Sequence, residues 1–126
     1  MMIGNFSKDN KEFIIKNMRS KRPLCNYLWN EDGVFKCDHF GFGNSFACIV
    51  SIRRSMDYGE SLVYIKDKFI GEFYNPNRNY TNLPFDNYSA LVGLGYHKVS
   101  SLYKGVCCDF SITMSTNGYN ILFQIK

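Results

Sequence analysis

Residues 105–126 read GVCCDFSITMSTNGYNILFQIK, and two alternating runs of apolar and polar residues meet there at Asn117-Gly118. The apolar positions are Val106, Cys108, Phe110, Ile112 and Met114 in the first run, and Tyr119, Ile121, Phe123 and Ile125 in the second. Asn-Gly tolerates the positive φ angles of a two-residue type I′ turn. The stretch therefore predicts a β-hairpin with one apolar face, which other strands or a helix must cover.

The composition indicates one folded domain spanning residues 1–126. Hydrophobic residues make up 45% of the chain and aromatic residues 17%, with only 3 prolines, which favours a β-rich packed core. No apolar run approaches the ~20 residues of a membrane-spanning helix, and the first residues lack the apolar centre of a signal peptide. We therefore expect a cytoplasmic protein.

The N-terminal segment, residues 1–22, is interpreted as a helix. Asp9 and Glu12 have the spacing of a capping box, and an apolar stripe with Phe13, Ile14 and Met18 follows before Pro23. This segment carries six cations against two anions, so the formal net charge of +4 resides there. A solvated helix face is the simpler interpretation. The alternative is a site for phosphate or an acidic partner, made by the four cations of the last turn, Lys16, Arg19, Lys21 and Arg22.

Residues 24–126 have the pattern of antiparallel strands. Hairpins are expected at 24–30 with 34–40 and at 62–66 with 69–74, a single strand at 45–54, a short strand at 90–95 and an irregular connection at 96–103. The predicted fold class is α+β, mostly β. The N-terminal helix would pack on a largely antiparallel sheet of about six to eight strands that could curl into a barrel. We expect Leu28, Phe110, Ile112, Ile121 and Phe123 in its core, together with the apolar stripe of the helix.

Residues 75–89 form the one long irregular stretch, and loops of this length are often functional. Aromatic side chains and an arginine there have the residue types of a binding surface. The partner-binding candidates are Tyr74, Arg78, Tyr80, Phe85 and Tyr88. Alternatively, these aromatic rings attach the loop to the sheet.

Motifs for chemistry are scarce. There is no P-loop, G-x-G-x-x-G, H-E-x-x-H or C-x-x-C, so neither a cofactor nor a metal is expected. Cys37 and His39 share a strand face and could act as nucleophile and base. Cys107 and Cys108 should point to opposite faces of a strand, so that one sulfur lies in the core.

Three function classes fit these observations. The first is a protein-binding inhibitor of the toxin-immunity or phage anti-defence type, which would cover the working surface of a partner protein with a preformed surface of its own. This is an analogy with a class of proteins. The isoelectric point near 8.8 would require an acidic or neutral partner face. The second is a small β protein that binds nucleic acid through exposed aromatics and the basic segment. The third is a small enzyme that uses Cys37 and His39.

Overall fold

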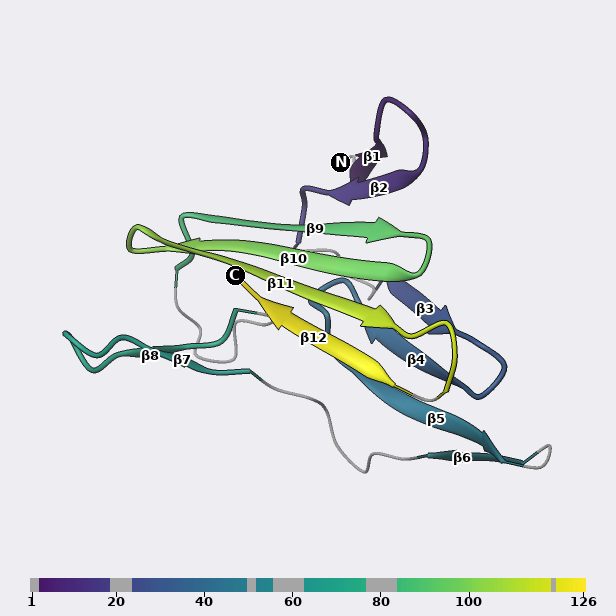
Figure 1. The fold of residues 1–126 in the computed structure, drawn as a ribbon. Helices are drawn as coiled ribbons and strands as arrows, with labels where there is room; N and C mark the ends of the chain where they lie inside the picture. Colours follow the sequence, from purple (N-terminus) through teal and green to yellow (C-terminus); the bar gives the residue numbers. More distant parts are fainter. Residues whose placement is uncertain (1–2, 19–23, 50–51, 56–62, 77–83, 119) are drawn as a thin grey trace.

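The computed structural model describes residues 3–18, 24–49, 52–55, 63–76, 84–118 and 120–126, and for 46–49 and 52–55 it describes the path of the backbone. All regular structure in these ranges is β-strand (Figure 1). The strands are β1 (Gly4–Phe6), β2 (Glu12–Ile15), β3 (Cys25–Trp29), β4 (Gly33–Asp38), β5 (Gly43–Ile49), β6 (Ile52–Ser55), β7 (Ile65–Lys66), β8 (Phe73–Tyr74), β9 (Asn87–Gly93), β10 (Tyr96–Tyr103), β11 (Val106–Met114) and β12 (Ile121–Ile125).

The strands form three antiparallel sheets. A six-stranded sheet has the order β1-β2-β9-β10-β11-β12, a four-stranded sheet the order β3-β4-β5-β6, and β7 and β8 pair with each other. The large sheet thus joins the first strands of the chain to its last four through β9 (Figure 1). The α+β prediction was wrong, because the described chain contains strands and no helix.

The segment expected to form the N-terminal helix is a β-hairpin. Asp9 lies in its turn, where the carboxylate accepts hydrogen bonds from the Ser7 hydroxyl (2.6 Å) and the Lys11 amide (3.3 Å). Glu12 accepts a hydrogen bond from the hydroxyl of Tyr96 on β10. Both carboxylates of the expected capping box therefore have partners that a helix would not provide. Pairing with β9 buries Ile15, and this long-range contact overrides the local helix signal.

Residues 96–103, expected to be an irregular connection, form the central strand β10. Its hydrogen-bonded neighbours are β9 and β11, and alternate side chains along it are buried. Lys104 and Gly105 connect β10 to β11, with φ angles of 48° and 81°. Positive φ at both residues is the signature of a type I′ turn, so the Lys104-Gly105 pair was a turn signal that the sequence interpretation missed.

The expected C-terminal hairpin is confirmed as β11 and β12, in the register Phe110↔Ile125 and Met114↔Ile121. Its connection is wider than the predicted two-residue turn, since the last pair before it is Met114↔Ile121 and the Ser115 amide donates to the Asn120 carbonyl (2.9 Å). Gly118 adopts a positive φ of 73° within this connection. The Asn-Gly pair therefore predicted the position of the chain reversal correctly, but not its length.

The other hairpins are partly as expected. β3 pairs with β4 and β7 with β8, which confirms two predicted hairpins. The turn between β7 and β8 is held by the Asp67 carboxylate, which accepts from the amides of Phe69 (2.7 Å) and Ile70 (3.2 Å). The single strand expected at 45–54 is wrong. In the structure this stretch contains two strands, β5 and β6, which pair antiparallel from Ile49↔Ile52. Residues 45–54 contain no Gly or Pro that would indicate a chain reversal.

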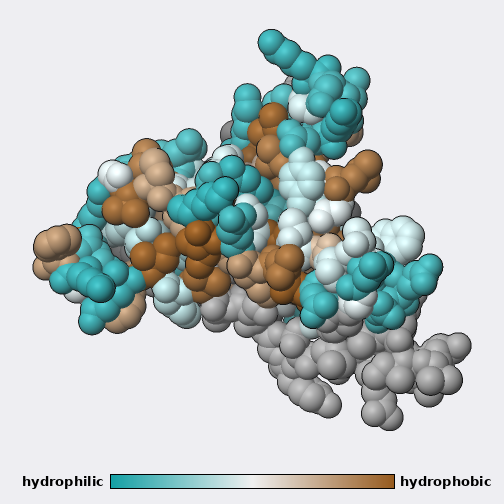
Figure 2. Space-filling model, in the orientation of Figure 1, coloured by the Kyte–Doolittle hydropathy of each residue, from teal (hydrophilic) through white to brown (hydrophobic). Residues whose placement is uncertain are grey.

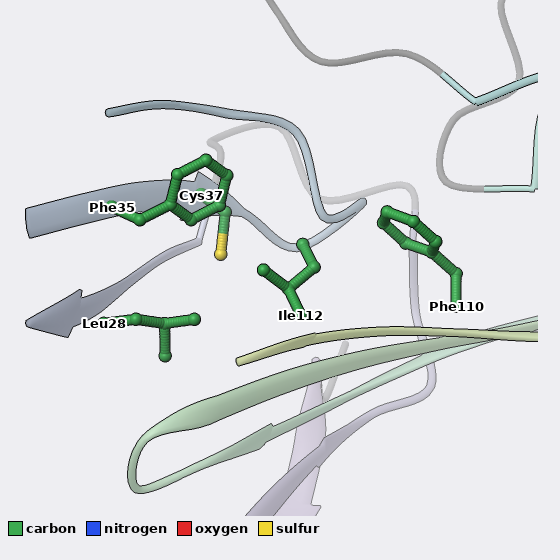
Figure 3. Close-up of a cluster of buried hydrophobic side chains, with 5 residues drawn as sticks. All are labelled: Leu28, Phe35, Cys37, Phe110 and Ile112. Carbon is green, nitrogen blue, oxygen red and sulfur yellow. The ribbon is translucent and has the colours of Figure 1, made fainter. Parts of the chain in front are cut away.

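The two larger sheets pack face to face. Leu28 on β3 and Phe35 and Cys37 on β4 form a buried cluster with Phe110 and Ile112 on β11. Figure 3 shows these five side chains between the strands of the two sheets. A second cluster, within the large sheet, consists of Ile15, Ala90 and Val99. The architecture is therefore a β-sandwich with a small additional hairpin, β7–β8.

The turn between β4 and β5 covers the point where these two clusters meet. Gly41 has a φ of 78°, and a Cβ atom there would lie 3.3 Å from side-chain atoms of Ile112, Phe110 and Val99. The backbone conformation therefore favours glycine here, and a Cβ atom would in addition crowd these three side chains.

The two aromatic residues expected at the centre of the core have different environments. Phe110 is 0% exposed, whereas Phe123 on the edge strand β12 is 42% exposed. Replacing Phe110 by Ala should lower the free energy of unfolding by about 3 to 5 kcal/mol, because it leaves a cavity between the sheets. Phe123→Ala should cost roughly 2 kcal/mol or less, because much of that ring is already in water. Urea denaturation of both variants tests this order. Equal losses would contradict the assigned packing.

A second prediction concerns the fully buried His97 on β10. Burial is the main cause that lowers the pKa of His97 from 6.5 to about 4; the backbone of His39 acts in the opposite direction, and the charge of the His39 ring lowers the pKa further. The unfolded chain therefore binds this proton at a higher pH than the folded chain does. The free energy of unfolding should therefore have its full value above about pH 6.5 and decrease by roughly 3 kcal/mol as the pH falls to about 4.

Urea denaturation at several pH values measures this loss. The matched control is His97→Phe, which keeps a buried ring without a titrating group. If this variant loses as much stability on acidification as the original chain, another group is responsible for the acid sensitivity.

Candidate functional site

A polar hollow of about 360 Å³ lies where the β3–β4 turn meets the β11–β12 connection. Both reversals lie at the right-hand end of the molecule in Figure 1. In Figure 2 this end is coloured mostly as hydrophilic, in contrast to the apolar side chains near the middle of the same view. The lining residues are Trp29, Asn30, Glu31, Asp32, Thr116, Asn117 and Gly118.

Asn30 positions both walls of the hollow. Its side-chain oxygen accepts hydrogen bonds from the amides of Asp32 (2.8 Å) and Gly33 (3.0 Å), which closes the β3–β4 turn. Its side-chain nitrogen donates to the carbonyls of Ser115 (2.9 Å) and Gly118 (2.8 Å) in the other wall. One side chain therefore determines the shape of a turn and connects it to a segment far away in the sequence.

A further hydrogen bond joins the same walls. The Gly118 amide donates to Oδ2 of Asp32 at 2.9 Å. The Ser115 hydroxyl lies within hydrogen-bond distance of the carbonyls of Asn117 (2.8 Å) and Gly118 (2.9 Å) and shares its one proton between them, so the second wall is also held by its own contacts. Backbone groups that would otherwise move independently are thus fixed around the hollow, which reduces the ordering cost of binding a ligand.

The lining has a definite chemical character. The indole of Trp29 is 73% exposed and offers a flat apolar surface. Glu31 and Asp32 supply carboxylates and Asn117 an amide, and the described residues that line the hollow include no cation. This combination suits a neutral ligand that has an apolar face and several hydroxyl groups, whereas an anion would be repelled.

Sequence reasoning missed this site. Glu31 and Asp32 were interpreted as turn residues and Trp29 as part of a strand, each correctly as far as local structure goes. The available signal was the pair of polar reversals, Asn30-Glu31-Asp32-Gly33 and Asn117-Gly118, but nothing in the local pattern shows that they adjoin.

The aromatic residues proposed to bind a partner pack inward where the structure describes them. Tyr74 is 3% exposed, and its ring centroid lies 5.5 Å from that of Tyr103 on β10. The rings of Phe85 and Tyr88 are 5.0 Å apart, and Phe85 also contacts Tyr103 at 5.7 Å. These rings attach the loop ends to the sheet. The other two candidates, Arg78 and Tyr80, lie outside the described residues.

Of the four cations proposed to contact phosphate or an acidic partner, Lys16 is exposed just after β2. Arg19, Lys21 and Arg22 lie outside the described residues. The correction of the helix to a hairpin removes the helical turn on which these four side chains were expected to gather.

Cys37 and His39 are both buried. Burial is the main cause that raises the pKa of the Cys37 thiol to about 12, so the thiol is protonated at neutral pH and is a poor nucleophile. The His39 ring is held by the backbone, since Nδ1 accepts from the Leu24 amide (3.3 Å) and Nε2 contacts the Met18 carbonyl at 3.2 Å. His39 thus connects the end of the first hairpin to the second sheet.

The adjacent pair Cys107 and Cys108 is arranged as expected for a strand. Cys107 is exposed and Cys108 is buried. Among the residues with described side chains, no group of three or more His, Cys, Asp and Glu residues could hold a metal ion. The described part of the chain also contains no helix with the length and apolar character to cross a membrane.

Comparison with known proteins finds a similarity to part of a longer protein. No family model matches the sequence. Over 113 residues, or 82% of the chain, the sequence is 33% identical to the solabiose phosphorylase of Paenibacillus borealis. The matched region is 15% of the length of that protein. The chain is therefore similar to a small part of a much longer protein, a solabiose phosphorylase.

Proposed function

We propose that this chain is a carbohydrate-binding β-domain of the kind that forms part of a disaccharide phosphorylase, and that it binds sugar without cleaving it. The observation that carries the proposal is the 33% identity to a solabiose phosphorylase over 82% of the chain. Solabiose, as the ending of its name indicates, is a disaccharide. A similarity that extends through most of a 126-residue chain is expected of a shared domain rather than of a shared short motif.

The chemistry of the hollow supports the same proposal. Sugar rings present C–H groups on their faces and hydroxyl groups around their edges. An exposed indole attracts the C–H face through its electron-rich π system, and carboxylate and amide oxygens accept hydrogen bonds from hydroxyl groups. Trp29, Glu31 and Asn117 bring these groups to one hollow.

Two observations support binding without catalysis: the small size of the matched region and the described side chains of the hollow. A phosphorylase transfers a glycosyl group to phosphate and therefore needs an acid for the leaving oxygen and a site that accepts phosphate. The part of the lining that the structure describes has carboxylates but no cation, which does not suit phosphate. The matched part is also only 15% of the enzyme, which leaves most of that protein to supply the reaction.

The inhibitor hypothesis has less support. Its proposed contact residues Tyr74, Phe85 and Tyr88 pack among one another and against Tyr103, where they offer little surface to a partner. The nucleic-acid hypothesis relied on a helix that is a hairpin in the structure. Neither hypothesis has an observation that favours it over carbohydrate binding.

Saturation-transfer NMR of the full chain with solabiose, cellobiose and lactose tests the proposal. We expect magnetisation transfer to these disaccharides with a Kd on the order of 1 mM, because an open hollow buries only part of a small ligand. Sorbitol, an acyclic polyol without a ring face, is the control and should show no transfer.

A second assay separates binding from catalysis. Incubation of the chain with solabiose and phosphate should release no sugar phosphate. No transfer to any of the three disaccharides would contradict carbohydrate binding, and release of a sugar phosphate would contradict a purely binding role.

A further inference from the structure

We infer that the hollow between the β3–β4 turn and the β11–β12 connection is the sugar site, that Trp29 is its stacking platform, and that it selects neutral sugars over sugar phosphates. The inference rests on the proposed carbohydrate-binding function and deepens it by naming the site and the class of ligand. Three features carry it: the position of the indole, the fixed polar walls and the sign of the charge.

Trp29 is placed for contact with a ligand rather than for stability. It is the last residue of β3, where Leu28 points into the core and Trp29 points away from it. Its side chain is 73% exposed although it is the only tryptophan of the chain. An exposed indole gains little for folding, but a sugar ring that stacks on it removes apolar surface of both partners from water.

The polar walls leave acceptors free for a ligand. Asn30 uses its oxygen and nitrogen to hold the two turns, and Oδ2 of Asp32 accepts from the Gly118 amide. The second oxygen of Asp32 and the carboxylate of Glu31 accept no hydrogen bond from described residues, and both side chains are exposed. These acceptors lie on a frame that is already formed, so sugar hydroxyl groups meet them without reorganisation of the turns.

The volume and charge of the hollow define the ligand. Small-molecule sites typically measure ~300 to 1,000 Å³, so a hollow of about 360 Å³ suits one or two sugar rings. Among the described residues, its lining contains two carboxylates and no cation. A sugar phosphate would bring its negative charge next to Glu31 and Asp32, which costs binding energy that a neutral sugar does not lose.

Intrinsic fluorescence gives a direct test, because every emitted tryptophan photon comes from the proposed site. Titration of the full chain with solabiose or cellobiose should change the Trp29 emission with the same Kd that saturation-transfer NMR reports. Glucose 1-phosphate should bind more weakly than glucose, and the difference should shrink as salt is added, because salt screens the repulsion by Glu31 and Asp32. Stronger binding of the phosphate would overturn the neutral selectivity.

Two variants complete the experiment. Trp29→Ala should weaken disaccharide binding measured by NMR by about tenfold or more, while its circular dichroism and melting temperature stay near those of the original chain. The matched control is Phe69→Ala, which removes a fully exposed aromatic ring in the β7–β8 turn, outside the hollow, and should leave binding unchanged.

The outcomes separate this inference from the proposed function. If disaccharides bind by NMR but the fluorescence does not respond and Trp29→Ala binds equally well, the site is elsewhere and the carbohydrate-binding function stands. If no disaccharide binds by either method, both proposals fail. A loss of binding in Trp29→Ala but not in Phe69→Ala supports the assigned site.

Discussion

The structure depends on the burial of one face of β11 against the second sheet. Phe110 and Ile112 project from β11, the neighbour of the edge strand β12, into the space bounded by Leu28, Phe35 and Cys37. Each large apolar side chain buried in this way contributes about 1.5 to 3 kcal/mol, so a few such residues supply a large part of the stability of a small domain. This cluster therefore helps to determine how β3 and β4 lie on β11. It thereby places the β3–β4 turn beside the β11–β12 connection.

The candidate site is a consequence of that packing. Once the two reversals adjoin, Asn30 and Asp32 can reach the backbone of residues 115–118, and their three hydrogen bonds hold the walls at a fixed separation. Thus the apolar contact brings the segments together, and the polar contacts define the shape of the hollow. Trp29 is outside both sets of interactions. It faces away from the core and takes no part in the bonds between the turns, which leaves its ring available to a ligand.

Local patterns predicted individual hairpins better than they predicted the arrangement of sheets. The alternation of residues 106–114 correctly placed Cys108, Phe110 and Ile112 in the interior, because alternation in a strand translates directly into two faces. The prediction of a helix in residues 1–22 was wrong for the opposite reason, since the local pattern there fits two structures. Phe13, Ile14 and Ile15 fit a helix stripe or a strand, and the choice was made by hydrogen bonds to β9, more than seventy residues away. β10 was missed because the turn before β11 is Lys104-Gly105, in which a lysine adopts the positive φ that Asn or Asp usually supplies.

By itself the sequence determined a β-rich domain, the pairing of β3 with β4, β7 with β8 and β11 with β12, and the absence of the common catalytic motifs, because each of these follows from residues close together along the chain. Only the tertiary structure decided that the first segment joins the large sheet, that Phe123 lies at an exposed edge while Phe110 is enclosed, and that Asn30 meets Gly118. The physical reason is that side-chain periodicity shows which residues share a face, whereas packing and hydrogen bonding between distant segments select the partner of that face. Asp32 and Gly118, which are hydrogen-bonded, are 86 positions apart in the sequence.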